Sequence, residues 1–545
     1  MRFTDLINEK KVVFFDGAMG TSLQTYLSSD TPPEKLNLTL PDKVKQVHYS
    51  YIKEGVHVIE TNTFGANRVK LEKYNLGRFV KDINYQAVKL AKEIASPSSV
   101  LVGASVGPLG DLIQPWGQIT AHQAFEVFKE QIEILVEAGV DLIVIETMMH
   151  LKEAKIAVMA AKEVSNIPVV CQLTFNEEGK TLTGSDPEIM TATLEKMDVE
   201  VVGANCSVGP REMLSVAEQM SLHTKKFLIF QPNAGKPYIK DGKTIFPVKP
   251  KEFSEWMIKF IEKGAKIVGG CCGTTPLHIR AMIAKVKDIP SPTDRKVHIL
   301  KGLSSRTKFL HLGEKESFKV GANLMISPGL NEEKLRERLI EIKEKAFSFI
   351  NVSWQNRKEG EVSIGHFINL IQETVDLPVT LEVATHLLEK SLEEIEGKPA
   401  VLSNEHDEKS IEIARKWGAM VGIKIPIEED KTDLKEKVNL LEEKFFKNKD
   451  HDLLVLTFPL NHSLKKRYFP LKKIFDQVTN IKSTRFKVPV FIKLNMFHAS
   501  ESFNKFLTGF FMGMANWYGL DGAIIDSSFD NTVFSILKAS EIFLG

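Results

Sequence analysis

DLIVIET, at residues 141–147, contains a short run of branched apolar residues, 142–145, which the acidic side chain of Glu146 follows. A run of this length and composition is typical of a strand buried on both faces, as in a parallel sheet. Segments with helical periodicity flank it on both sides. The stretch therefore indicates a βα unit of an α/β protein.

The same pattern recurs along residues 1–290, where each apolar run ends at a glycine, a turn residue or a helix cap and a helical segment follows. Eight repeated βα units predict a closed (β/α)8 barrel of the TIM type. The eight expected strands are VVFFD (12–16), VHVIET (56–61), VLVGAS (100–105), DLIVIET (141–147), PVVCQLTF (168–175), VEVVGANC (199–206), FLIFQPN (227–233) and KIVGGCC (266–272).

Residues 291–308 mix prolines, serines and charges without a clear period, which is typical of a linker. A second series of apolar runs follows, so we expect a second (β/α)8 barrel over residues 309–545, in tandem with the first. Its expected strands are KFLHLG (308–313), FSFINVSW (347–354), LPVTLEV (377–383), KPAVLSN (398–404), AMVGIKI (419–425), DLLVLTF (452–458), VPVFIKLN (488–495) and DGAIID (521–526).

The bulk composition narrows the class of ligand and the compartment. With 71 basic and 70 acidic residues among 545, the chain has a formal charge of +1, which argues for neither a nucleic acid nor an anionic membrane as partner. The first residues lack the apolar core of a secretory signal, and glycines and Asp521 interrupt the most apolar late stretch. The sequence therefore predicts a cytoplasmic protein that acts on a small molecule.

Polar and reactive residues stand where the expected strands of the first barrel end. The carboxyl ends of barrel strands meet on one face, where such folds build their active sites, although single strand ends also adjoin polar loops for no functional reason. These residues are Asp16, Thr61, Asn62, Ser105, Glu146, Thr174, Asn205, Cys206, Asn233, Cys271 and Cys272.

Three of the four cysteines form the sharpest signal. Cys206 ends the sixth expected strand, while Cys271 and Cys272 end the eighth, so all three approach the same mouth of the barrel. Three thiolates plus one exchangeable ligand suit a tetrahedral Zn²⁺ with an open position, which Asn233 is placed to fill. The alternatives are an incidental cysteine pair and an asparagine that only holds its own loop, while Cys171 reads as a buried core residue.

Zinc held by thiolates binds a further thiol and lowers its pKa, so the bound thiol is a thiolate at neutral pH. Such a site activates sulfur nucleophiles. The expected reaction is in-line attack of that thiolate on an electrophilic methyl group.

Five motifs of the first half resemble the homocysteine S-methyltransferase family, over residues 5–290. They are DGAMGT (16–21), TNTFGAN (61–67), GANCS (203–207), PNAGKP (232–237) and GGCCGT (269–274). The resemblance implies that Cys206, Cys271 and Cys272 bind zinc, with Asn233 as a provisional fourth ligand in the empty site.

The resemblance also implies where homocysteine binds. Its amino-acid end is expected beside Asp16, Gly20, Thr21 and Glu146, with Asn62 and Ser105 as weaker candidates. Backbone N–H groups of the Gly20–Thr21 turn can hold a carboxylate, and Glu146 can pair with an ammonium group. The alternative for Glu146 is an acid that stabilises a helix N-terminus.

The order of the two expected barrels resembles the first two modules of cobalamin-dependent methionine synthase, whose second module binds methyltetrahydrofolate. Glu314 and Asn495 match that folate-binding pattern as possible remnants, whereas Asn351 and Thr457 stand where the pattern has acidic residues. Losing two carboxylates leaves pterin N–H groups unpaired, so folate binding is doubtful. The alternative is a degenerate barrel kept as a scaffold or docking surface.

The methyl donor stays open. No D-x-H-x-x-G segment occurs in the chain, so methylcobalamin, if it is the donor, is expected on a separate corrinoid protein. Methyltetrahydrofolate is the less favoured source. The competing hypotheses are direct use of S-methylmethionine or betaine, and a docking partner for a corrinoid protein.

Overall fold

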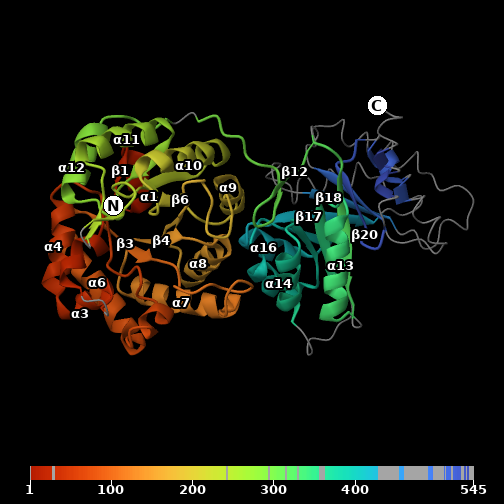
Figure 1. Ribbon diagram of the computed structural model, residues 1–545, viewed down its shortest axis with the longest axis horizontal. Coiled ribbons are helices and arrows are strands. Elements are labelled where there is room, and N and C mark those ends of the chain that lie inside the picture. The colour runs from red at the N-terminus through yellow and green to blue at the C-terminus, as the bar shows by residue number, and fades with distance from the viewer. Residues whose placement is uncertain are drawn as a thin grey trace, which may run out of the picture. The chain divides into compact units, whose positions relative to one another are not determined.

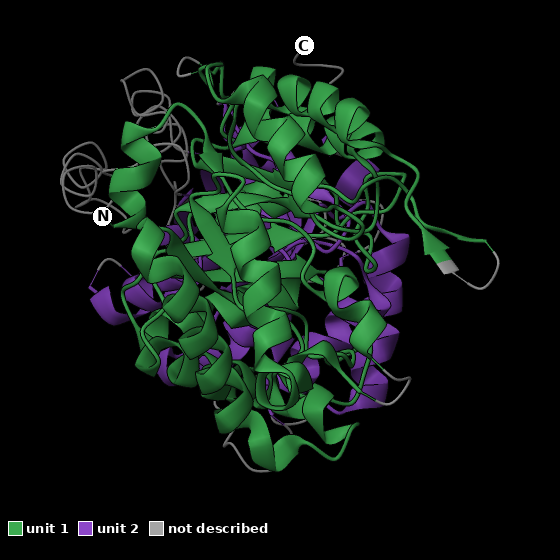
Figure 2. Cartoon of the chain, turned by 90° about the vertical axis from the view of Figure 1, so that its left-hand side faces the viewer, with its two compact units in different colours: residues 1–299 green, residues 300–545 purple. Residues whose placement is uncertain are grey.

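The chain forms two compact units, residues 1–299 and 300–545, in a computed structural model (Figures 1 and 2). Each unit contains a barrel of eight parallel strands wrapped by helices, so the expected tandem of TIM-type barrels is confirmed. The structure describes residues 2–27, 31–240, 243–292, 295–313, 316–327, 330–354, 363–404, 406–426, 453–458, 489–494, 508–509, 511–516, 519–529, 533–535 and 537–538.

The eight strands of the first barrel are the eight runs expected from the sequence. Neighbouring strands pair in parallel, and a bridge between Phe15 and Val58 brings the first strand beside the second. The strands are β1 (Val13–Phe14), β2 (Val58–Glu60), β3 (Leu101–Val106), β4 (Leu142–Met148), β5 (Val169–Leu173), β6 (Val201–Asn205), β7 (Phe227–Gln231) and β10 (Ala265–Val268).

Helices cover the outside of this barrel, and one closes its base. In α1 (Phe3–Glu9) the side chains of Phe3, Leu6 and Ile7 pack against apolar residues inside the barrel, such as Val13. The others are α2 (Gly20–Leu23), α3 (Leu36–Thr39), α4 (Pro41–Ile52), α5 (Arg68–Glu72), α6 (Val80–Ala95), α7 (Ala121–Glu137), α8 (Leu151–Val164), α9 (Pro187–Leu194), α10 (Pro210–His223), α11 (Pro250–Glu262) and α12 (Pro276–Val286). A small hairpin, β8 (Tyr238–Lys240) and β9 (Lys243–Ile245), projects from the unit (Figure 2).

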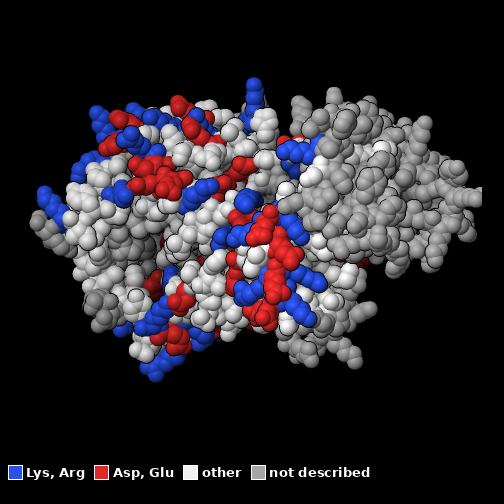
Figure 3. Space-filling view, turned by 45° about the vertical axis from the view of Figure 1, so that its right-hand side comes forward, with Lys and Arg blue, Asp and Glu red and all other residues white. Residues whose placement is uncertain are grey.

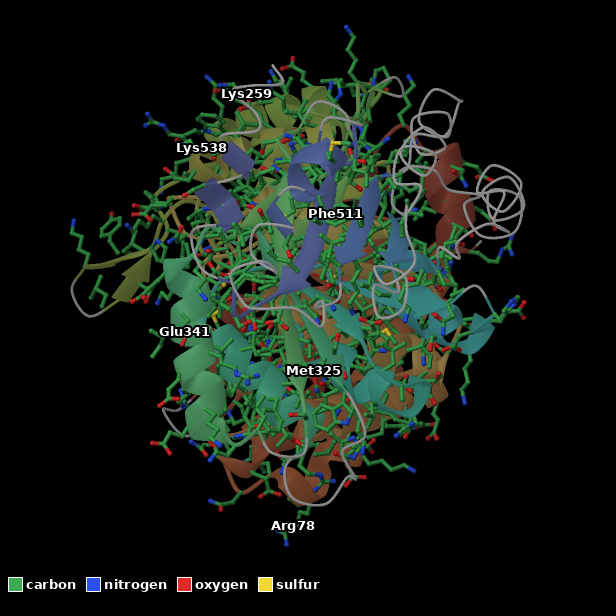
Figure 4. The ribbon with its side chains drawn as sticks, turned by 90° about the vertical axis from the view of Figure 1, so that its right-hand side faces the viewer. Arg78, Lys259, Met325, Glu341, Phe511 and Lys538 are labelled. Atoms are coloured by element: carbon green, nitrogen blue, oxygen red, sulfur yellow. The ribbon has the colours of Figure 1, made fainter. Side chains whose placement is uncertain are left out.

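The second barrel is closed, with eight parallel strands in chain order. Its strands are β13 (Lys319–Ile326), β14 (Phe349–Trp354), β15 (Val379–Glu382), β16 (Ala400–Asn404), β17 (Met420–Pro426), β18 (Leu453–Phe458), β19 (Val490–Leu494) and β20 (Gly522–Asp526). The helices with assigned bounds are α13 (Glu332–Glu344), α14 (Ile364–Thr374), α15 (Thr385–Glu394) and α16 (Glu408–Lys416). Figure 4 shows Met325 at the end of β13 and Glu341 on the outer helix α13.

The first strand expected for the second barrel is wrong. Residues 309–311 of KFLHLG form β12, which pairs antiparallel with β11 (Gly302–Ser304). Leu303 and Leu312 of this segment pack on the amino-terminal ends of the barrel strands, where they meet Phe349 and Met420. The true first strand is β13, whose apolar pattern is interrupted by Gly321 and Asn323 and was therefore missed.

The expected linker, residues 291–308, does not end where the sequence suggested. The boundary between the units falls after Ile299, and β11 already belongs to the second unit because Leu303 is part of its core. The expected folate-site residues Glu314 and Asn495 lie outside the described residues.

The surface carries both signs of charge. Basic and acidic side chains are interspersed on the face visible in Figure 3, as the near-zero formal charge suggests. Among the described helices, none combines the length and the apolar character that crossing a bilayer requires.

Candidate metal centre and substrate cavity

A cavity of about 220 Å³ opens at the carboxyl ends of the first barrel's strands. It brings together ten of the residues expected from the sequence, which come from six different strands and the loops that follow them. They are Asp16, Gly20, Thr21, Thr61, Asn62, Ser105, Glu146, Cys206, Cys271 and Cys272. The residues that line the cavity include no lysine, arginine or histidine.

The three cysteines form one cluster at this cavity. Their sulfur atoms lie within 4.8 Å of one another, with 3.9 Å between those of Cys206 and Cys272. Hydrogen bonds from Cys271 and Cys272 hold the pKa of the Cys206 thiol well below its usual range. Cys171, in contrast, is buried in the core, and burial raises its pKa to about 12. The cluster thus combines three thiols that can act as soft metal ligands.

Backbone hydrogen bonds hold the loops that carry these thiols. The N–H of Cys206 donates to the carbonyl of Gln231 (3.2 Å), and that of Cys271 donates to the carbonyl of Pro232 (3.0 Å). The carbonyl of Cys272 accepts from the N–H of Ala234 (3.0 Å). The loop after β7 therefore joins the two cysteine loops into one unit.

Gly273 shows why the segment after the cysteine pair needs glycine. Its φ of +77° lies in the left-handed region, and a Cβ there would come within 2.0 Å of the Phe246 ring. A side chain at this position would displace either the cysteine loop or the aromatic ring beside it.

Asn233, the expected fourth ligand, lies beside the cluster. Its side chain is in hydrogen-bonding contact with Cys206, and its Oδ1 atom is buried without a hydrogen-bond partner. A buried carbonyl oxygen without a partner is costly unless a ligand or metal engages it. Asn233 is not among the residues that line the cavity.

Glu146 is a buried acid of the cavity wall that accepts hydrogen bonds from several side chains. It lies within β4 and not at a helix N-terminus, so it is not an acid that stabilises the N-terminus of a helix. Its carboxylate accepts from Ser105 Oγ (2.5 Å) and from Asn205 Nδ2 (2.8 Å). Asn205 Nδ2 also lies 4.0 Å from the sulfur of Cys271, so one amide bridges the acid and the cysteine cluster.

Asp16 lies beside a second acid that the sequence analysis missed, Glu60 at the end of β2. The N–H of Glu60 donates to Asp16 Oδ2 (3.1 Å), and Glu60 Oε2 accepts from Gln231 Nε2 (3.1 Å). Burial raises the pKa of Asp16, and burial together with the charges of Glu146 and Asp16 raises that of Glu60, both well above the usual range. The cavity thus concentrates acidic side chains whose ionised forms are disfavoured in the empty site.

Gly20, Thr21 and Asn62 line the cavity, and Thr21 and Asn62 also hold neighbouring loops in place. Gly20 opens α2, and Thr21 Oγ1 accepts from the N–H of Gly273 (3.2 Å), which ties the first loop to the cysteine segment. Asn62 lines the cavity, but its amide donates to Pro33 O (2.8 Å) and Asn37 Oδ1 (3.0 Å), so it also fixes a neighbouring loop.

Glu60 and Gln231 could have been found in the sequence. Each is a polar residue at the end of an otherwise apolar strand, in VHVIE and FLIFQ. The contact between them could not, because 171 positions separate them along the chain.

The second barrel contains a separate polar network. Glu382 on β15 pairs with Lys493 on β19 and with Lys424 on β17, the latter at 2.9 Å. Burial favours the neutral acid, but the two lysines outweigh it and lower the pKa of Glu382 to about 2. Asn351 also contacts this network, because its Nδ2 donates to Asn323 Oδ1 (2.7 Å) and lies 3.3 Å from Glu382.

The profile of the family described as homocysteine S-methyltransferase matches residues 13–286, which is half of the 545-residue chain. The chain belongs to the homocysteine S-methyltransferase family. The matched residues run from the first strand of the first barrel to its last helix and contain the whole cavity.

Two methionine synthases are similar to the chain. That of Mycobacterium tuberculosis is 32% identical over 322 residues, which cover 55% of this chain and 27% of the relative. That of Mycobacterium leprae is 31% identical over 303 residues, which cover 52% and 25%. The chain thus covers about a quarter of the length of these relatives. Among solved structures, the metallated homocysteine methyltransferase MmuM of Escherichia coli matches with a TM-score of 0.45 and 21% identity, over 51% of this chain and 98% of that one.

Proposed function

We propose that the first unit transfers a methyl group to the thiol of homocysteine and so forms methionine. One observation carries the proposal: three thiols within 4.8 Å of one another stand at a cavity that is lined by carboxylates and by no basic side chain. The thiols suit a metal that activates a sulfur nucleophile, and the acids suit the ammonium group of an amino acid. Homocysteine carries both groups.

Zinc is the proposed metal, held by Cys206, Cys271 and Cys272. Asn233 is the proposed fourth ligand before substrate binds, supported by its position beside Cys206 and by its unpartnered buried Oδ1. When bound, the metal lowers the pKa of the substrate thiol and so supplies a thiolate at neutral pH. The chain's own contribution is to hold the loops rigidly and to orient the substrate.

The amino-acid end of homocysteine is proposed to bind on the acid side of the cavity. Glu146 and Asp16 pair with the ammonium group, and the Gly20–Thr21 turn is proposed to hold the carboxylate through backbone N–H groups. Ser105 acts on the substrate through Glu146, to which its hydroxyl donates. This arrangement leaves the sulfur end of the substrate at the cysteine cluster.

A methylcorrinoid on a separate protein is the first proposed donor, and methyltetrahydrofolate is the second. The polar network of Glu382, Lys424 and Lys493 supports this order, because the oxygens of that carboxylate are already engaged by lysines and cannot pair with pterin N–H groups. S-methylmethionine or betaine remains the alternative small donor. A role as a docking partner for a corrinoid protein is the alternative from outside enzymology.

The test is to incubate the purified, zinc-loaded chain with homocysteine and each donor in turn: methylcobalamin, methyltetrahydrofolate, S-methylmethionine and betaine. We expect methionine with methylcobalamin, and none from the same mixture when the Cys272→Ala variant replaces the chain. Methionine formed only with S-methylmethionine or betaine would reverse the order of donors. No methionine with any donor, despite bound zinc, would favour the docking alternative.

A further inference from the structure

Two carboxyl oxygens, on neighbouring residues that line the substrate cavity, lack a hydrogen-bond donor. Oδ1 of Asp16 and Oε1 of Glu60 are buried, and neither accepts a hydrogen bond. Both residues line the cavity, at the ends of neighbouring strands β1 and β2. Buried carboxyl oxygens without donors are costly, so the pair is incomplete without a ligand or a proton.

The three acids of this wall are supported unequally. Burial raises the pKa of Glu146, but hydrogen bonds from Ser105, Asn205 and Thr147 oppose this shift. Asp16 Oδ2 accepts one backbone N–H, and Glu60 Oε2 accepts one amide N–H, from Gln231. Of the three acids, Glu146 therefore has the most hydrogen bonds that favour its ionised form, and Asp16 and Glu60 have fewer.

The neighbours of Glu60 offer no compensating charge. It faces Asp16 from β1, Glu146 from β4 and the neutral Gln231 from β7. Among the described residues that line the cavity, none is basic. Two adjacent carboxylates in a low-dielectric site, beside a third, cannot both stay ionised near neutral pH.

We infer that Asp16 and Glu60 hold one proton between them in the empty cavity and release it to solvent when the ammonium group of an amino acid binds. The inference rests on the proposed function, since it requires an amino acid in this cavity. Glu60 is then a positioning residue. It shares the proton with Asp16 in the empty cavity, so that two adjacent carboxylates are not both ionised before the ammonium group binds.

The ammonium group drives the release for two reasons. Its positive charge favours the ionised form of both acids, and its N–H groups supply donors to the two unpartnered oxygens. The proton passes from the carboxyl pair to the buffer, and no other bond changes. Binding should therefore strengthen with rising pH, up to about tenfold per pH unit, as long as the empty pair is protonated.

Methionine distinguishes the proton of the carboxyl pair from the proton that the thiol of homocysteine loses. It has the same amino-acid end as homocysteine but no ionisable sulfur. We would titrate the zinc-loaded full chain with L-methionine at pH 7 in buffers that differ in ionisation enthalpy. The dependence of the measured heat on the buffer gives the number of protons released. We expect about one proton per methionine for the wild type.

In the Glu60→Gln variant we expect much less release, because the introduced amide can donate an N–H to Asp16 and so favours the ionised form of Asp16 before the ligand arrives. Glu153→Gln is the matched control, since Glu153 is a buried acid outside the cavity lining that accepts the N–H of Leu109 (2.8 Å). The Glu153→Gln variant should release about as many protons per methionine as the wild type does. Infrared difference spectra provide a second readout: methionine should remove a protonated carboxyl band in the wild type and not in Glu60→Gln.

Methionine binding without proton release and without loss of that band, or with the same release in Glu60→Gln, would overturn the inference and leave the proposed function standing. Absence of methionine binding to the zinc-loaded wild type would instead count against the proposed function, and the inference would fall with it.

Discussion

Cys206 and Thr147 both adopt a left-handed backbone conformation, with φ of 60° and 57°, although neither is glycine. Thr147 directly follows Glu146, which lines the cavity, and Cys206 directly follows Asn205, whose amide donates to Glu146. Residues in this conformation cost on the order of 1 kcal/mol or more and persist only where the surroundings impose them. Here hydrogen bonds between the two turns impose them, since Asn205 Oδ1 accepts the N–H of Thr147 (2.7 Å).

The cysteine cluster predicts the metal content of the chain. We expect about one zinc per chain by elemental analysis, and loss of most of it in Cys271→Ala or Cys272→Ala, because two thiolates and an amide bind far more weakly than three thiolates. Cys171→Ala is the matched control and should keep the metal, as Cys171 lies in the core outside the cluster. Full zinc in both cluster variants would refute the site.

Glu146 predicts the strength of amino-acid binding. Replacing it with Gln removes a charged partner of the ammonium group, worth roughly 1.5–3 kcal/mol, so methionine affinity should fall about 10- to 100-fold. Zinc content should not change. Ser105→Ala removes only one hydrogen bond to Glu146 and should have a smaller effect. Calorimetric titration with methionine measures the affinity of both variants. Equal affinity in Glu146→Gln and wild type would contradict the proposal that Glu146 binds the ammonium group.

At the scale of elements, each barrel is closed at its base by the segment that precedes its first strand. The helix α1 fills the first barrel with Phe3, Leu6 and Ile7, whereas the β11–β12 hairpin covers the second with Leu303 and Leu312. Both segments exclude water from the amino-terminal ends of the strands, as the core of a closed barrel requires. The carboxyl end of the first barrel is thereby left as the open face that holds the cavity.

The strands of the second barrel are joined across their interior by the ion pairs of Glu382. Lys493→Met should destabilise this unit by about 1–3 kcal/mol, because it leaves a partly buried carboxylate with one partner fewer. The matched control is Arg336→Met, which breaks an exposed pair with Glu332 and should have a much smaller effect on the free energy of unfolding. Denaturant unfolding measures both changes, and equal effects would contradict the structural role of Glu382.

The same pairs predict a pH dependence. The pKa of Glu382 is lowered in the folded state, from 4.5 to about 2, so its stabilisation is complete above the unfolded value and is lost as pH falls through this window. The stability difference between wild type and Glu382→Gln should therefore shrink between about pH 5 and pH 2. A difference that stays constant over this range would show that Glu382 is not ionised by its lysines.

At the scale of the whole molecule, two barrels of the same architecture carry different interiors. The first holds a cavity lined by acids and thiols, whereas the described interior of the second holds a network whose polar groups pair with one another. Thr457 Oγ1 likewise donates to the carbonyl of Ile425 (3.3 Å). A pterin ring needs hydrogen-bond acceptors that are free, whereas the acceptors of this network already accept hydrogen bonds from side chains of the barrel.

We therefore expect weak or absent binding of methyltetrahydrofolate to the full chain, measured by equilibrium dialysis. L-methionine bound by the same preparation would verify that the protein is folded. Micromolar affinity for methyltetrahydrofolate would contradict the expectation and make folate the source of the methyl group.

The alternation of apolar runs and helical segments was enough to predict two eight-stranded barrels, because local periodicity reports which residues are buried. It also placed Cys206, Cys271 and Cys272 at one mouth, since the carboxyl ends of barrel strands converge. All eight strands of the first barrel were predicted, and the strand ends and the family motifs together pointed to ten residues that line its cavity.

Only the tertiary structure decided the rest. Whether KFLHLG or KVGANLMI begins the second barrel depends on pairing of β13 with β14 and with β20 some 200 residues later, which no local pattern reports. The contact of Glu60 with Asp16 and Gln231 and the pairing of Glu382 with two lysines likewise arise from closure of the barrels. The period of a strand records that a side chain is buried, but the identity of its neighbours is determined by long-range packing.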